Sequence, residues 1–102
     1  MQTDVHHILI GYQGSLPGTQ VTRSKDEAKA LATRILHDAR KKGANFTSLQ
    51  KNNNQDPGPG PYTATPMAQL VPPFKALSLA LGVGQIGICE TQFGFHVIKR
   101  IK

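Results

Sequence analysis

The chain has 102 residues, 38% of them hydrophobic and 6% aromatic, and this length predicts one compact domain spanning residues 1–102. Twelve Lys and Arg against six Asp and Glu give a net charge of +6, with eight of the twelve cations between residues 23 and 51. No apolar run is long enough to span a bilayer, the first ten residues lack the order of a signal peptide, and the single cysteine excludes an internal disulfide.

The N-terminal half predicts a strand and then an amphipathic helix. The run DVHHILIGY is rich in β-branched and aliphatic residues and predicts a strand that ends at Gly11. After a polar loop, Ser24 and Glu27 have the spacing of a capping box, which predicts the start of a helix. Gly43 ends this helix after a basic last turn. The residues that recur at helical spacing on one face are Ala28, Leu31, Ala32, Ile35, Leu36 and Ala39.

The rest of the chain predicts two further helices and a pair of strands. A short helix is expected over residues 44–51 with Phe46 and Leu49 inward, followed by a long Pro-rich loop over 52–66 with a brief extended segment at 62–65. The run PPFKALSLAL predicts a helix with its two prolines in the first turn. Residues 82–90 turn into a strand, and GFHVIKRIK is the last strand. Their short connection favours an antiparallel sheet with helices packed on it, an α+β fold.

Three motifs that suggest chemistry have simpler interpretations. GVGQIG, residues 82–87, matches GxGxxG, but a helix precedes it and a strand follows, so it predicts a turn instead of a dinucleotide site. Cys89 lies in an apolar strand and is expected to be a small core or edge residue. His6 and His7 are adjacent in a strand and point to opposite faces, so no metal site is expected.

Two strand histidines remain. By strand parity His7 shares a face with Val5 and Leu9, and His96 shares one with Ile98. A lone histidine on such a face is usually a hydrogen-bonded core residue. If the first and last strands are neighbours, the two rings can hydrogen-bond each other and form a buried polar network, which is costly unless every member is satisfied. The residues alone leave core filling and chemistry both open.

The segments HHILI, QDPG, LVPPFKALSLALGVGQIG and TQFGFHVIKR resemble, in this order, the parvulin-type peptidyl-prolyl cis/trans isomerases. The resemblance runs from Val5 to Lys102 and is strongest between Thr91 and His96. It implies a parvulin-like fold of the FKBP-like superfold, with a four-stranded antiparallel sheet and about three to four surrounding helices. It also implies rotation about X–Pro bonds of polypeptide substrates, without a metal or other cofactor.

The resemblance assigns individual residues to this activity. Its catalytic positions fall on His7, Asp56, Thr91 and His96, and its substrate-binding positions fall on Met67, Gln69, Leu70, Phe74 and Phe95. The stretch GPGPYTATPMAQL departs from the family's glycine-rich pattern. Gly60 stands for one glycine, Tyr62 for a leucine, and Thr65 for the aromatic wall of the pocket.

One parvulin branch requires a phosphorylated residue before proline and carries a lysine where this chain has Gly11. Only Arg23 and Lys25 follow here, at the helix entrance, so we expect no requirement for phosphorylation. A catalytically weak chaperone or peptide-binding module is an alternative. A basic domain that binds nucleic acid or an acidic partner is less favoured, because aromatic platforms for bases are missing. We expect a monomer; the localisation stays open between the cytoplasm and a domain of an exported folding factor.

Overall fold

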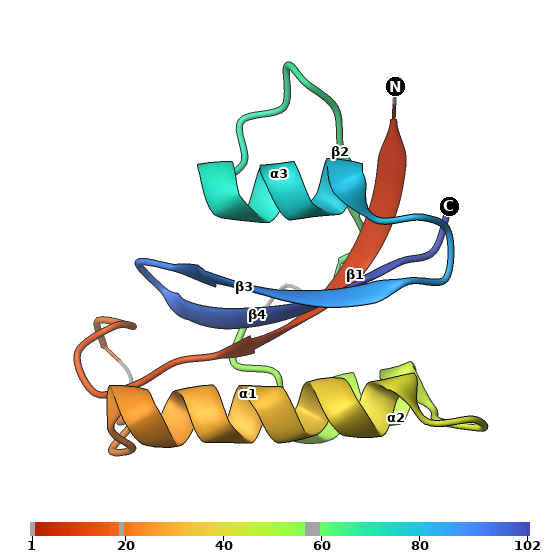
Figure 1. Cartoon of the computed structure of the whole chain (residues 1–102). Helices are drawn as coiled ribbons and strands as arrows, with labels where there is room; N and C mark the ends of the chain where they lie inside the picture. Colours follow the sequence, from red (N-terminus) through yellow and green to blue (C-terminus); the bar gives the residue numbers. More distant parts are fainter. Residues whose placement is uncertain (1, 19, 57–59) are drawn as a thin grey trace.

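The computed structural model of the chain describes residues 2–18, 20–56 and 60–102, in which helices cover both faces of a four-stranded antiparallel sheet (Figure 1). The strand order is β2-β1-β4-β3, so the first and last strands are the two central ones. Helices α1 and α2 lie on one face and α3 on the other (Figure 1). This confirms the α+β fold. In chain order the elements are β1 (Thr3–Ile10), α1 (Lys25–Arg40), α2 (Phe46–Asn53), β2 (Tyr62–Ala64), α3 (Pro72–Ala80), β3 (Ile86–Thr91) and β4 (Gly94–Arg100).

Strand alternation divides the buried side chains into two layers. Toward α1, Ile8 lies opposite Val97 and Ile10 opposite Phe95, within an apolar cluster that includes the buried face of α1. The alternate residues of the same strands face α3, and there the apolar cluster consists of Val5, Phe74, Leu81 and Ile98. The predicted parity is confirmed, because His7 is opposite Ile98 and therefore faces α3.

Helix α1 begins as the sequence predicts, but it ends at Arg40 with Lys41 as its C-cap, before the predicted end at Gly43. The Ser24 hydroxyl accepts from the Glu27 N–H at 3.1 Å, and the Glu27 carboxylate accepts from the Ser24 N–H at 2.9 Å, so the capping box is present. Arg40 in the last turn donates from Nε and Nη2 to the Ile86 carbonyl, at 3.1 and 2.7 Å, which ties the helix to β3. Within the described ranges, none of the helices combines the length and the apolar character needed to cross a bilayer.

Helix α2 extends further than expected. It continues to Asn53, past the predicted end at residue 51, and the Asn54 N–H still donates to the Gln50 carbonyl. Asp56 therefore lies three residues after the end of the helix, within the predicted Pro-rich loop. Residues 57–59 of that loop lie outside the described residues.

The segment between α3 and β4 also follows its prediction. The Gln85 N–H donates to the Gly82 carbonyl at 2.9 Å, so GVGQIG begins with a turn. Cys89 is half-buried against the α3-side cluster, and burial raises the pKa of its thiol to about 11, which keeps it protonated and unreactive. At the β3–β4 turn, Gly94 has φ +133°, and a Cβ there would collide with the Ile10 carbonyl oxygen. Glycine therefore permits β4 to begin directly against the end of β1.

Candidate functional site

The two central strands bring the two buried histidines together. His7 on β1 and His96 on β4 are diagonal neighbours on the sheet face that α3 covers. Their Nδ1 atoms are 3.1 Å apart, and their rings are stacked at an interplanar angle of 15°. The sequence left core filling and chemistry open, and this contact shows that the two rings form one polar unit.

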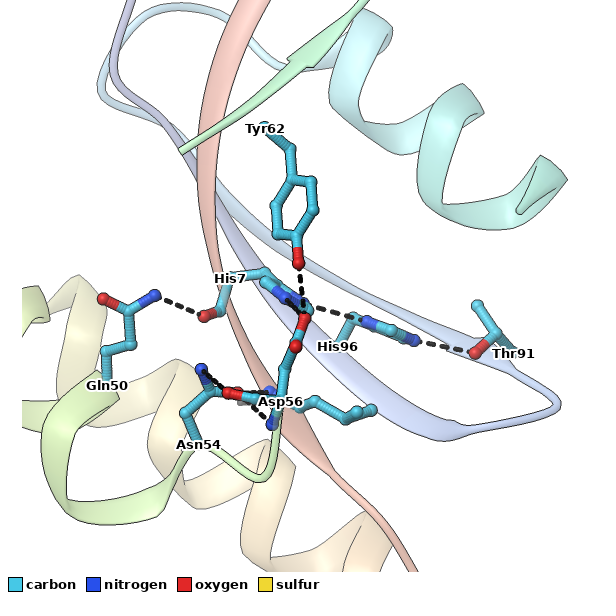
Figure 2. A network of polar contacts seen from close by, with 8 residues as sticks. His7, Gln50, Asn54, Asp56, Tyr62, Thr91 and His96 are labelled. Carbon is cyan, nitrogen blue, oxygen red and sulfur yellow. Dashed lines mark hydrogen bonds and ion pairs between the residues drawn. The ribbon is translucent and has the colours of Figure 1, made fainter. Parts of the chain in front are cut away.

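This pair lies in the middle of a longer chain of hydrogen bonds (Figure 2). Nε2 of His7 contacts Oδ2 of Asp56 at 2.8 Å, and the Tyr62 hydroxyl donates to the same oxygen at 2.7 Å. At the other end, Nε2 of His96 contacts the Thr91 hydroxyl at 2.7 Å. These hydrogen bonds run from β2 through the loop after α2 to β1, β4 and β3. We call the five residues that they join the polar chain: Tyr62, Asp56, His7, His96 and Thr91.

An ionised Asp56 sets the direction of every hydrogen bond in the polar chain. A carboxylate only accepts, so Nε2 of His7 donates to it. A neutral imidazole has one donor and one acceptor nitrogen, so Nδ1 of His7 accepts from Nδ1 of His96. Nε2 of His96 then accepts from the Thr91 hydroxyl, whose oxygen in turn accepts from the Phe93 N–H at 3.2 Å. Both imidazoles are therefore satisfied in the neutral state.

Burial favours the same neutral state. Desolvation lowers the pKa of His7, although the Asp56 carboxylate acts in the opposite direction. Desolvation, with repulsion from His7, lowers the pKa of His96 to about 4. For Tyr62, desolvation and the hydrogen bond to Asp56 raise the pKa to about 12, so its phenol is a permanent donor near neutral pH. Burial thus favours two neutral imidazoles and a neutral phenol in the polar chain at neutral pH.

Backbone contacts hold Asp56 in position although it follows a helix end. The Leu9 N–H donates to the Asn54 side-chain oxygen at 2.8 Å, and the Gln55 N–H donates to the Leu9 carbonyl at 2.9 Å. The Gly11 N–H donates to the Gln55 side chain, and the Asp56 N–H donates to Asn54 Oδ1 at 3.1 Å. Residues 54 and 55 are thus held to the backbone of residues 9–11 by one backbone and two side-chain hydrogen bonds, which places the carboxylate of Asp56 beside His7.

A small apolar cavity opens onto this polar chain. Its volume is about 130 Å³. The Phe74 ring packs edge-on against His7 and His96, with centroids 5.1 and 5.3 Å away, and against Tyr62 at 5.9 Å. The cavity can therefore hold a compact apolar group next to a row of fixed hydrogen-bonding groups. Its lining residues are His7, Asp56, Tyr62, Leu70, Val71, Phe74 and His96.

The structure brings most of the predicted site residues together. His7, Asp56, His96, Leu70 and Phe74 line the cavity, and Thr91 lies one hydrogen bond behind it.

Three predicted substrate contacts lie elsewhere. Met67 is 90% exposed and Gln69 is exposed, and neither lines the cavity. Phe95 is buried on the opposite sheet face, in the α1-side cluster near Tyr12. The expected substrate contact of Phe95 does not fit this geometry, because its neighbour His96 takes the cavity side of the strand.

Tyr62 and Val71 line the cavity but were not predicted to act in it. The family resemblance placed Tyr62 only at the position of a leucine, although a buried tyrosine usually needs a partner for its hydroxyl.

Among the described residues, no group of three His, Cys, Asp or Glu side chains is arranged to hold a metal ion. A larger open hollow of about 750 Å³ between the end of α1 and β3 has no His, Cys or acidic residue in its lining.

Replacing His96 by Leu is expected to lower the free energy of unfolding by about 1–3 kcal/mol at pH 7, because His7 and Thr91 each lose a buried partner. This difference should shrink in acid. Because the folded pKa of His96 is about 4 against 6.5 ordinarily, the unfolded wild-type chain binds a proton between these pH values that the folded chain does not. Wild-type stability therefore falls as the pH falls through this window.

At about 1.4 kcal/mol per pKa unit, the loss specific to the wild type amounts to about 3 kcal/mol. Urea unfolding of both proteins at pH 7 and pH 4 measures the difference directly, and ionisations common to both cancel. A stability difference as large at pH 4 as at pH 7 would contradict the lowered pKa.

Comparison with known proteins identifies the family and supports the fold. The family model for the PPIC-type PPIASE domain matches residues 1–101. No curated protein sequence matches the chain. The solved structure of TbPIN1 is 21% identical, with a TM-score of 0.78, over 99% of this chain and 97% of that one. The PPIase domain of TbPar42 is 18% identical, with a TM-score of 0.75, over 100% and 99% of the two chains.

A third structure is longer than this chain. PrsA from Bacillus subtilis is 22% identical with a TM-score of 0.68, and the match covers 99% of this chain but 35% of PrsA, so the chain spans about a third of PrsA. At these identities the structures show the fold, and the family model shows the family. The chain belongs to the PPIC-type family of peptidyl-prolyl cis/trans isomerase (PPIase) domains.

Proposed function

We propose that the cavity beside the polar chain binds the proline ring of an X–Pro bond and catalyses its rotation without requiring a phosphorylated residue before proline. The observation that supports this most is the joint presence of an apolar cavity of about 130 Å³ and the fixed carboxylate of Asp56 at its wall. Sites for drug-sized ligands occupy about 300–1,000 Å³, so this volume suits a single ring.

Rotation about an X–Pro bond is limited by a torsional barrier and involves no covalent intermediate. The partial double bond of the planar amide creates a barrier of about 18–20 kcal/mol, and no bond has to break. A catalyst needs only to bind the twisted amide more tightly than the planar one. Gripping the ring in an apolar cavity leaves the preceding carbonyl free to turn.

The polar groups of the site favour the twisted amide. A planar amide carries negative charge on its oxygen, and twisting removes much of it. The Asp56 carboxylate beside the cavity disfavours that charge, and exclusion of water removes a competing stabilisation. The planar state is therefore raised relative to the twisted one.

The histidines act in this scheme as a framework. Bond rotation requires no proton transfer, so a general acid or base has no step to serve. His7 and His96 are held neutral by burial and form one wall of the cavity. Their contribution is to hold Asp56 and the cavity wall in fixed positions.

Truncating the cavity wall should lower isomerase activity while the fold survives. Leu70→Ala removes a partly buried wall residue, and Phe74→Leu keeps an apolar side chain in the core but removes the ring. We expect kcat/KM to fall at least about tenfold in each, since about 1.4 kcal/mol of binding to the turning amide is lost. A proline-isomer assay on a short peptide measures this, with folding checked by thermal melts.

Val83→Ala is the matched control, because Val83 is 66% exposed in the turn before β3, away from the cavity. Full activity in both wall variants would show that the cavity is assigned wrongly. A wild-type chain that binds proline peptides without accelerating exchange would favour the alternative of a peptide-binding module.

The two cations at the entrance of α1, Arg23 and Lys25, are already engaged. Nη1 of Arg23 donates to the Gly11 carbonyl at 3.0 Å and to the Gln55 side chain at 2.8 Å. Nζ of Lys25 pairs with the Glu90 carboxylate at 2.9 Å. A phosphate with about −1.5 to −2 charges needs several donors to offset its desolvation. Binding one here would require Arg23 to release the loop that it fastens.

Peptide pairs that differ only in phosphorylation of the serine before proline test this specificity. We expect their kcat/KM values to agree within about fivefold, the effect of a single exposed ion pair. NMR exchange spectroscopy on both peptides gives the comparison without a coupling protease. A much larger gain on phosphorylation that disappears in Arg23→Ala would contradict the proposal.

A further inference from the structure

Tyr62 contacts both the polar chain and the aromatic wall of the cavity. It lies on β2, where it pairs with Val5 of β1, and its side chain points across the cavity to Asp56 (Figure 2). Its ring packs edge-on against His7 at 5.2 Å and Phe74 at 5.9 Å. The ring is thus a wall of the cavity, and the hydroxyl is a donor to the polar chain.

The hydroxyl shares one carboxylate oxygen with a histidine. Oδ2 of Asp56 accepts from Tyr62 at 2.7 Å and from Nε2 of His7 at 2.8 Å, from two different strands. Two donors on one oxygen favour the ionised carboxylate and fix its rotation about the side-chain bonds. Without the phenol, this oxygen would lose one of these two donors.

The ring has a separate consequence. Thr65 stands where the family resemblance implies an aromatic residue of the pocket wall, and Thr65 does not line the cavity. The aromatic surface of the cavity comes instead from Tyr62 on β2 and Phe74 on α3. Both functions of the wall, shape and carboxylate orientation, thus meet in one side chain.

We propose that Tyr62 is a positioning residue of the isomerase, whose hydroxyl holds Asp56 ionised and aimed at the bound X–Pro bond while its ring walls the cavity. This inference rests on the proposed function of the cavity. It assigns to Tyr62 an effect on turnover that acts through Asp56, which distinguishes it from a residue that only fills space.

A double-mutant cycle tests the coupling. Tyr62→Phe removes only the hydroxyl and keeps the ring contacts, and we expect kcat/KM to fall about tenfold, as for the loss of a hydrogen bond to a charged group. In an Asp56→Asn background the same change should have less than about a twofold effect, because the group that it orients is gone. Equal effects in both backgrounds, or no effect in the wild type, would overturn the proposal.

The chain offers a matched control, because it has two tyrosines. Tyr12 packs on Phe95 and under Nζ of Lys25, on the other side of the sheet from the cavity. Tyr12→Phe makes the same chemical change there and should leave kcat/KM unchanged. A loss in Tyr12→Phe equal to that in Tyr62→Phe would attribute the effect to the general removal of a phenol and overturn the assignment.

A spectroscopic measurement separates failure of this inference from failure of the proposed function. In Tyr12→Phe the only phenol is Tyr62, with a pKa of about 12, so at pH 10.5 we expect only about 3% phenolate, against about 75% for an ordinary phenol. Adding Asp56→Asn should raise the phenolate fraction several-fold. Absorbance at the phenolate band measures it, with circular dichroism confirming that the chain is folded.

This result does not depend on turnover. Suppose that the Tyr62 phenol stays protonated at pH 10.5 and that Asp56→Asn raises its phenolate fraction, but that the wild type is inactive. The contact between Tyr62 and Asp56 is then correct, and the proposed function fails, together with the role of Tyr62 in catalysis. If Tyr62 ionises as an ordinary phenol in the folded chain, the contact with Asp56 is absent and the inference fails even when the wild type is active.

Discussion

The hydrogen bond between Nδ1 of His7 and Nδ1 of His96 is the contact on which the rest of the site depends. Two ring nitrogens at 3.1 Å share one proton, so one ring donates and the other accepts. Two charged rings would repel each other away from water, so burial keeps both neutral. With Nδ1 of His96 as the donor, Asp56 accepts at one end and Thr91 donates at the other, and the whole polar chain has one consistent set of protons.

The sheet separates the polar network from the main apolar core, because its two faces carry different side chains. The face toward α1 carries an apolar core of aliphatic residues and Phe95, which holds β1 and β4 together. The face toward α3 carries the polar chain and the cavity, on the two central strands. A site on rigid central strands stays in register, which suits a reaction that depends on shape and fixed charge. Residues 54 and 55, bonded to the backbone of residues 9–11, extend the same rigidity to Asp56.

Local patterns predicted the elements well, and contacts between distant segments explain what they missed. The capping box at Ser24 and the parity of His7 and His96 are local, and both are confirmed. The hydroxyl contact of Tyr62 and the engagement of Arg23 with Gln55 depend on how loops fold back on β1, which no local pattern encodes. For Phe95 two sequence arguments disagree. The family resemblance placed it in the substrate site, whereas adjacent residues of a strand point to opposite faces, so Phe95 and His96 do not share the cavity face.

Nitrogen NMR of the imidazole rings tests the central claim most directly. At pH 7 the account predicts two neutral rings, with His7 protonated on Nε2 and His96 protonated on Nδ1, since this is the arrangement that satisfies Asp56 and Thr91 together. Because burial lowers both pKa values, the same tautomers should persist to a lower pH than in ordinary imidazoles. An imidazolium at His7 or His96 at pH 7, or the reverse pair of tautomers, would contradict the account.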